Sequence, residues 1–65
     1  MEDKMRALVE SGKLTFKDAR KGRIATGDYG TCVNLAVKLA RESGQPLNRC
    51  WGQVCTIYWR LFDER

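Results

Sequence analysis

The chain has 65 residues, a formal net charge of +4 at neutral pH and no histidine; 43% of its residues are hydrophobic and 31% are charged. This length allows one domain, residues 1–65, and the composition lies outside the range typical of disordered chains. No apolar run approaches the ~18 residues of a membrane span, and the N-terminus does not resemble a secretory signal. We therefore expect a cytoplasmic protein with no membrane partner.

The three cysteines, Cys32, Cys50 and Cys55, do not have the spacing of a disulfide framework. On one helix, Cys50 and Cys55 would be separated by about 7.5 Å along the axis, which is too far for an unstrained disulfide. A structural zinc site needs four ligands, and the chain has neither histidine nor a C-x-x-C pair. The sequence therefore predicts free thiols, no metal and no cofactor.

The first part of the chain predicts two short helices and a turn. Apolar residues at helical spacing predict a first helix that begins at the N-terminus and that Gly12 ends. Thr15 and Asp18 resemble a capping box and predict a second helix over residues 15–25. Residues 26–30 include two glycines and predict a turn, in which Asp28 is a candidate helix cap.

The second part predicts two longer helices. Residues 31–43 are apolar around most of a helical circumference and predict a central helix, which Gly44 ends. The last helix follows Pro46, with Gln45 or Asn48 as its cap, and should run to about residue 63. No segment alternates with the period of a strand. The pattern predicts an all-α fold, a single-domain bundle of three to four short helices, for which a dimer is an open alternative.

The last helix carries more apolar surface than one stripe needs. Its predicted core-facing stripe consists of residues at three- and four-residue steps: Leu47, Cys50, Trp51, Val54, Cys55, Tyr58, Leu61 and Phe62. Ile57 and Trp59 fall outside this stripe, in the company of Arg60. Because Trp and Arg are enriched at binding hot spots, these three residues are candidate partner contacts. The alternative is that the first helix, of this chain or of a second subunit, covers Ile57 and Trp59.

The net charge is concentrated in residues 13–23, KLTFKDARKGR. This basic segment has five basic side chains and one acidic one, whereas the remainder of the chain has seven of each. The candidate contacts are Lys13, Lys17, Arg20, Lys21 and Arg23. Clustered cations on one helix would suit phosphates or an acidic protein surface, but they are also typical of the solvated side of a helix.

Two further motifs fail on inspection. Residues 35–54 have the small residue and the turn glycine of a helix-turn-helix, but Pro46 interrupts the turn and the second helix would present Cys50 and Trp51. The segment TGDYGT, residues 26–31, lacks the lysine and the spacing of a phosphate-binding loop.

These observations favour a binding protein over an enzyme, since the chain offers few groups for acid–base or nucleophilic catalysis. The preferred hypothesis is a small non-enzymatic regulator or inhibitor that docks on a protein with an acidic surface. The alternative is a basic, dimeric transcriptional regulator that binds nucleic acid, and a structural accessory subunit is a third possibility. In general form, the chain resembles the small accessory proteins of bacteriophages and other mobile elements.

Overall fold

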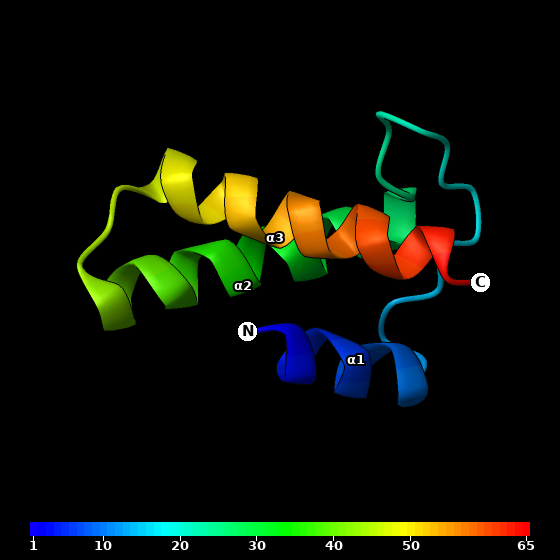
Figure 1. Ribbon diagram of the computed structural model, residues 1–65, viewed down its shortest axis with the longest axis horizontal. Helices are drawn as coiled ribbons and strands as arrows, with labels where there is room; N and C mark the ends of the chain where they lie inside the picture. Colours follow the sequence, from blue (N-terminus) through cyan, green and yellow to red (C-terminus); the bar gives the residue numbers. More distant parts are fainter.

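The computed structural model describes all 65 residues and contains three α-helices and no β-sheet. The helices are α1 (Glu2–Glu10), α2 (Thr26–Ser43) and α3 (Leu47–Asp63). Figure 1 shows α2 and α3 as an antiparallel hairpin, with α1 along one side of the pair and residues 11–25 looped around the end where α3 finishes. The predicted all-α architecture is confirmed, with three helices. None of them is long and apolar enough to cross a membrane.

The ends of the helices follow the predicted stop signals. Gly12, directly after the last turn of α1, has a φ of 84°, and Gly44, which ends α2, has a φ of 70°. Both angles lie in the left-handed region that glycine adopts without a steric penalty. Pro46 occupies the position before α3, and no side chain caps that helix. The predicted caps at Gln45 and Asn48 are therefore wrong.

Residues 15–25 form a loop, so the predicted second helix is wrong. The backbone amides of Thr15 and Phe16 donate hydrogen bonds of 2.9 and 2.8 Å to the carboxylate of Asp28, and not to carbonyls within the segment. Phe16 also has a φ of 56°, which a right-handed helix excludes. Contacts with a distant aspartate thus override the local signal for a helix.

Helix α2 begins five residues before the predicted start, at Thr26. The carboxylate of Asp18 accepts hydrogen bonds from the Thr26 amide at 2.9 Å and from its hydroxyl at 3.1 Å. Asp18 therefore caps the first turn of α2. The sequence had predicted that it caps a helix over residues 15–25. Gly27 and Gly30 lie inside α2, and the predicted turn at residues 26–30 is wrong.

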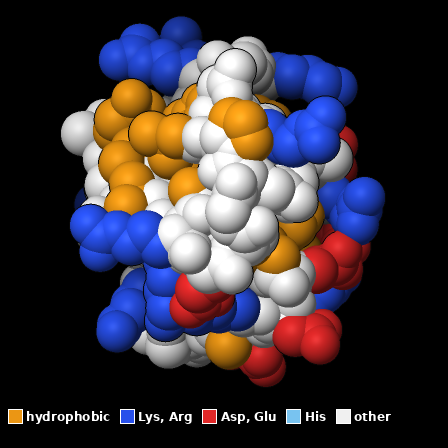
Figure 2. Space-filling model, turned by 90° about the vertical axis from the view of Figure 1, so that its left-hand side faces the viewer, with side chains coloured by type: hydrophobic (Ala, Val, Ile, Leu, Met, Phe, Trp, Pro, Cys, Tyr) orange, Lys and Arg blue, Asp and Glu red, His pale blue; other side chains and the backbone are white.

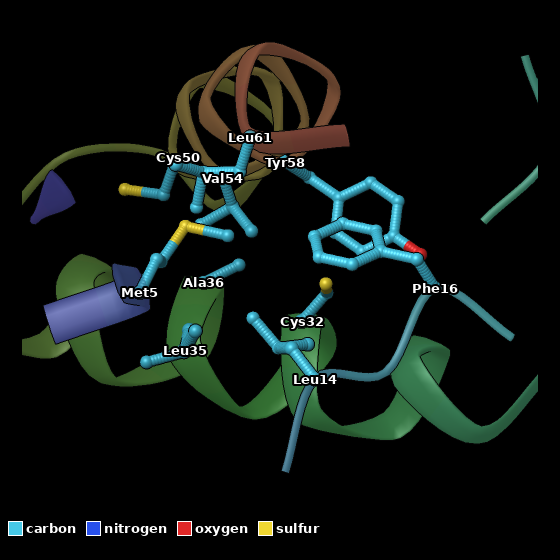
Figure 3. Packing of buried hydrophobic residues seen from close by; sticks show 10 residues of the cluster. All are labelled: Met5, Leu14, Phe16, Cys32, Leu35, Ala36, Cys50, Val54, Tyr58 and Leu61. Atoms are coloured by element: carbon cyan, nitrogen blue, oxygen red, sulfur yellow. The ribbon is translucent and has the colours of Figure 1, made fainter. Parts of the chain in front are cut away.

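The hydrophobic core lies between α2 and α3 and is completed by α1 and the loop. Figure 3 shows Met5 of α1, together with Leu14 and Phe16 of the loop, directed toward the space between the two long helices. The other core residues come from α2 and α3 and are Cys32, Leu35, Ala36, Cys50, Val54, Tyr58 and Leu61.

The predicted core stripe of α3 is confirmed at four buried positions, Cys50, Val54, Tyr58 and Leu61. Trp51, Cys55 and Phe62 are only half-buried. Leu47 is 52% exposed, so its assignment to the core is wrong. It lies in the first turn of α3, beside a surface cavity that residues of α2 and α3 alone line.

Candidate functional site

A buried carboxylate anchors the loop to the helices. Asp28 lies in α2 and is fully buried. Its carboxylate accepts hydrogen bonds from the backbone amides of Thr15 and Phe16, and one of 2.7 Å from the Tyr58 hydroxyl. The hydroxyl oxygen of Tyr58 in turn accepts a hydrogen bond of 3.2 Å from the backbone amide of Ala25. Burial and the hydrogen bond to Asp28 raise the pKa of Tyr58. The network fixes both ends of the loop, and Asp28 is therefore an anchor, not the helix cap that the sequence predicted.

The loop presents its cations on a tight turn. The backbones of Arg20 and Arg23 pair through two hydrogen bonds, of 3.0 and 2.7 Å, around Lys21 and Gly22. Gly22 has a φ of 86°, a conformation that tight turns demand and that glycine adopts freely. The side chains of Arg20, Lys21 and Arg23 are all exposed. We call this turn, residues 20–23, the basic turn.

An apolar groove begins beside the basic turn and continues between α2 and α3. It consists of two cavities of about 550 and 510 Å³, which share Tyr29 and Trp51. Arg23 lines the first cavity together with Trp59. We call this surface the aromatic groove and define it by Tyr29, Val33, Leu47, Trp51, Cys55 and Trp59.

One side of the aromatic groove is a single ridge of α3. Leu47, Trp51, Cys55 and Trp59 follow one another at four-residue intervals, which places them along one row of the helix surface. The row spans about 18 Å, at 1.5 Å per residue. Figure 2, seen from the end where α2 joins α3, shows hydrophobic side chains gathered on one part of the surface with Lys and Arg beside them, while Asp and Glu gather on another part.

Edge-to-face contacts hold the aromatic rings of the groove in place. The rings of Tyr29 and Trp51 lie 5.6 Å apart, with an angle of 68° between their planes. Trp59 makes similar contacts with Tyr58 at 5.0 Å and with Phe62 at 5.4 Å. Such pairs contribute about 0.5–1.5 kcal/mol beyond the burial of their surface. The groove is therefore lined by ordered rings.

The structure separates the three candidate contacts of α3. Ile57 and Trp59 are two residues apart, which corresponds to a rotation of about 200° around the helix axis, so their side chains face different sides of α3. Ile57 is half-buried and lines a shallow cavity with Glu2 of α1 and with Arg60, whose guanidinium is paired with Glu2 at 2.6 Å. Helix α1 thus lies beside Ile57, as the alternative interpretation expected, but it contributes no residue to the cavity that Trp59 lines.

The five basic candidates are also divided. Arg23 lines the aromatic groove, and Arg20 and Lys21 lie next to it in the basic turn. Lys17 is exposed in the loop, whereas Lys13 lines a different cavity, between α1 and α2.

Five of the six residues that define the groove were not among the candidate contacts. Tyr29 was assigned to a turn and Val33 to the apolar central helix. Leu47, Trp51 and Cys55 were assigned to the core stripe of the last helix. The four-residue spacing from Leu47 to Trp59 was the signal that could have identified the ridge. Its exposure could not be read from the spacing, because the same pattern describes a buried stripe.

Comparison with protein families, with curated proteins and with solved structures finds no match to this chain. No group of three or more Cys, Asp or Glu side chains is placed to hold a metal ion.

Proposed function

We propose that this protein is a small non-enzymatic regulator or inhibitor that acts by binding another protein in the aromatic groove. The observation that carries the proposal is the gathering of Trp51, Trp59 and Tyr29 with Arg23 around one continuous surface groove. Trp, Tyr and Arg are the residues that most often carry the binding energy of protein interfaces. Tyr29 is 56% exposed, and together with Leu47 it presents apolar surface that a partner would cover.

The occupant that fits this groove is an amphipathic helix of the partner. A length of about 18 Å corresponds to about three helical turns, which present apolar side chains at i, i+3 or i+4, and i+7. Arg23 at one end, with Arg20 and Lys21 beside it, favours an acidic residue at the corresponding end of that helix. The partner is therefore a protein with an acidic, amphipathic helix.

The lining of the groove favours a protein over nucleic acid. Its lining includes Val33 and Ala36, whose side chains offer no hydrogen bonds to base edges. Both tryptophans already contact neighbouring rings edge-on. Arg23 is the one cation that lines the groove, whereas binding of a nucleic-acid strand relies on a row of them.

The test is capture of partners from cell lysate by the wild-type protein and by matched variants, with and without nuclease. Leu47→Glu and Tyr29→Ala alter exposed groove positions, so the fold should persist, and circular dichroism would verify this. Ile57→Ala is the control, because Ile57 lies outside the groove. We expect a protein that the wild type and Ile57→Ala retain, that both groove variants lose, and that nuclease does not release. A synthetic helix from that protein should then bind the wild type and lose affinity for Arg23→Glu.

Three results would contradict the proposal. Capture that depends on nucleic acid would favour the alternative of a nucleic-acid-binding regulator. Capture that is equal for the groove variants would place the binding surface elsewhere. A second copy of this chain as the sole occupant of the groove, detected as a dimer by light scattering and abolished by Leu47→Glu, would make the groove a homodimer interface.

A further inference from the structure

Three lysines converge on a cavity of about 370 Å³ between α1 and α2. Lys4 reaches it from α1, Lys13 from the loop just after α1, and Lys38 from α2. The apolar part of its lining is Leu8 and Leu35. This cavity shares no residue with the aromatic groove, so it is a separate feature of the surface.

Backbone hydrogen bonds fix the places in the fold from which these lysines extend. Lys4 lies in α1, and the amide of Lys13 donates a hydrogen bond of 2.9 Å to the carbonyl of Leu8. Lys38 shares one face of α2 with Thr31 and Asn34, because these residues are spaced by three and four positions. The cavity therefore has three cations and two neutral polar side chains, all attached to ordered backbone.

No carboxylate lines this cavity or forms an ion pair with its lysines. The ion pairs of the structure all involve Arg6 or Arg60, and no lysine takes part in one. The neighbouring ammonium group of Lys38 lowers the pKa of Lys4, and Glu42 opposes this effect only in part. Three lysines and no carboxylate line this cavity, which gives it the positive charge that an anion site requires.

We propose that Lys4, Lys13 and Lys38 form a binding site for a small, multiply charged phosphate ligand such as a diphosphate group. Lysine binds phosphate as a compact point charge with three rotatable donors. The Thr31 hydroxyl and the Asn34 amide supply further donors on the same face.

The arrangement favours a discrete phosphate group over the backbone of a nucleic acid. The three lysines line one cavity, and no other Lys or Arg lines it. The cations of the basic turn do not extend this cluster, because Arg23 lines the aromatic groove and neither Arg20 nor Lys21 lines the lysine cavity.

The test is a titration of the ¹⁵N-labelled protein with inorganic pyrophosphate at constant ionic strength, followed by amide chemical shifts. We expect shifts at the amides of Lys13, Thr31 and Lys38, and none in the aromatic groove. Lys4→Gln and Lys38→Gln should each weaken binding about tenfold, the loss expected for one hydrogen bond to a charged group. Lys17→Gln is the matched control and should bind as the wild type does, because Lys17 does not line the cavity.

A second measurement separates loss of binding from loss of fold. Without ligand, Lys4→Gln and Lys38→Gln should raise the unfolding temperature, because each removes a repulsion between like charges. Pyrophosphate should then raise the unfolding temperature of the wild type and of Lys17→Gln, but not that of the two cavity variants.

The remaining arms of the titration use sulfate, inorganic phosphate and single-stranded and duplex oligonucleotides. Tighter binding of pyrophosphate than of sulfate supports the proposal. An equal response to sulfate, or equal affinities of Lys38→Gln and Lys17→Gln for pyrophosphate, would overturn it. Binding of oligonucleotides without binding of pyrophosphate would also overturn it, and would identify phosphodiesters as the ligand.

Discussion

The Tyr58 hydroxyl donates a hydrogen bond of 2.7 Å to the Asp28 carboxylate, and neither side chain has exposed surface. A buried carboxylate is unfavourable unless hydrogen bonds replace its lost hydration. Here two backbone amides of the loop complete the set of donors to Asp28, and no buried side-chain nitrogen or oxygen lacks a partner. One polar contact between α2 and α3 thus also holds the loop that carries Arg23 to the edge of the aromatic groove.

Tyr58→Phe is expected to destabilise the fold by about 1–3 kcal/mol, because it leaves the buried amide of Ala25 and one interaction of Asp28 unsatisfied. Urea unfolding followed by circular dichroism measures this free energy. Tyr29→Phe is the matched control, since Tyr29 is 56% exposed, and it should change the free energy of unfolding little. Equal effects of the two substitutions would show that the buried network contributes nothing to stability.

The sequence was sufficient to predict the helices whose signals are local. Helix α1 and the last helix have periodic apolar residues, and Gly44 with Pro46 marks the connection between α2 and α3. The four buried positions of α3 follow directly from helical spacing. These features depend on residues within a few positions of one another, so a single sequence is enough to predict them.

The loop could not be predicted in this way, because its structure depends on distant partners. Thr15 and Asp18 have the spacing of a capping box, but Thr15 donates its amide to Asp28, and Asp18 caps Thr26 instead. The groove was missed for a related reason. Spacing identified the apolar residues of α3, but it could not show where α1 packs. Helix α1 lies beside Ile57 and leaves Trp59 on an open groove.

Gly44→Ala and Gly52→Ala should have opposite effects on stability. A Cβ atom at either position meets no atom within 4 Å, so space does not distinguish them. Gly44 has a φ of 70°, where a side chain is disfavoured by about 1–2 kcal/mol. Gly52 lies inside α3, where alanine is favoured over glycine by about 0.5–1 kcal/mol. Thermal unfolding of the two variants would test this, and destabilisation by Gly52→Ala would contradict it.

The contact between α1 and the end of α3 should weaken in acid. Arg6 pairs with Glu2 at 3.0 Å and with Glu64 at 2.9 Å, and its hydrogen bonds lower the pKa of both carboxyls below the ordinary value of 4.5. A carboxyl whose pKa is lower in the folded state stabilises the fold fully above the unfolded pKa, and this contribution is lost as the pH falls through the folded pKa. We therefore expect the unfolding temperature to fall as the pH drops below about 4.5.

Unfolding curves between about pH 3 and pH 6 would measure that dependence. Arg6→Gln should make it shallower, and high salt should do the same because these charges are exposed. Asp3→Asn is the control, because Asp3 takes part in no ion pair. If Arg6→Gln left the pH dependence of stability unchanged, that dependence would come from other carboxylates, and the prediction would be wrong.

The three thiols should differ in reactivity, and the one in the aromatic groove reports on its occupancy. Burial, with a smaller effect of Asp28, raises the pKa of Cys32 to about 12, so this thiol stays protonated and protected near neutral pH. Cys50 is also buried, whereas Cys55 is half-buried and lines the groove, although partial burial raises its pKa as well. With a chromogenic disulfide reagent at about pH 8 we expect slow labelling of Cys55 alone in the folded protein, and of all three cysteines after unfolding.

Cys55→Ser should abolish labelling of the folded protein, and Cys32→Ser should leave it unchanged. A partner helix in the groove should cover Cys55 and slow its labelling further, whereas pyrophosphate, bound between α1 and α2, should not. Because the two proposed sites share no residue, this thiol distinguishes occupancy of one from occupancy of the other. Labelling of Cys32 as fast as that of Cys55 would mean that the core between α2 and α3 opens readily.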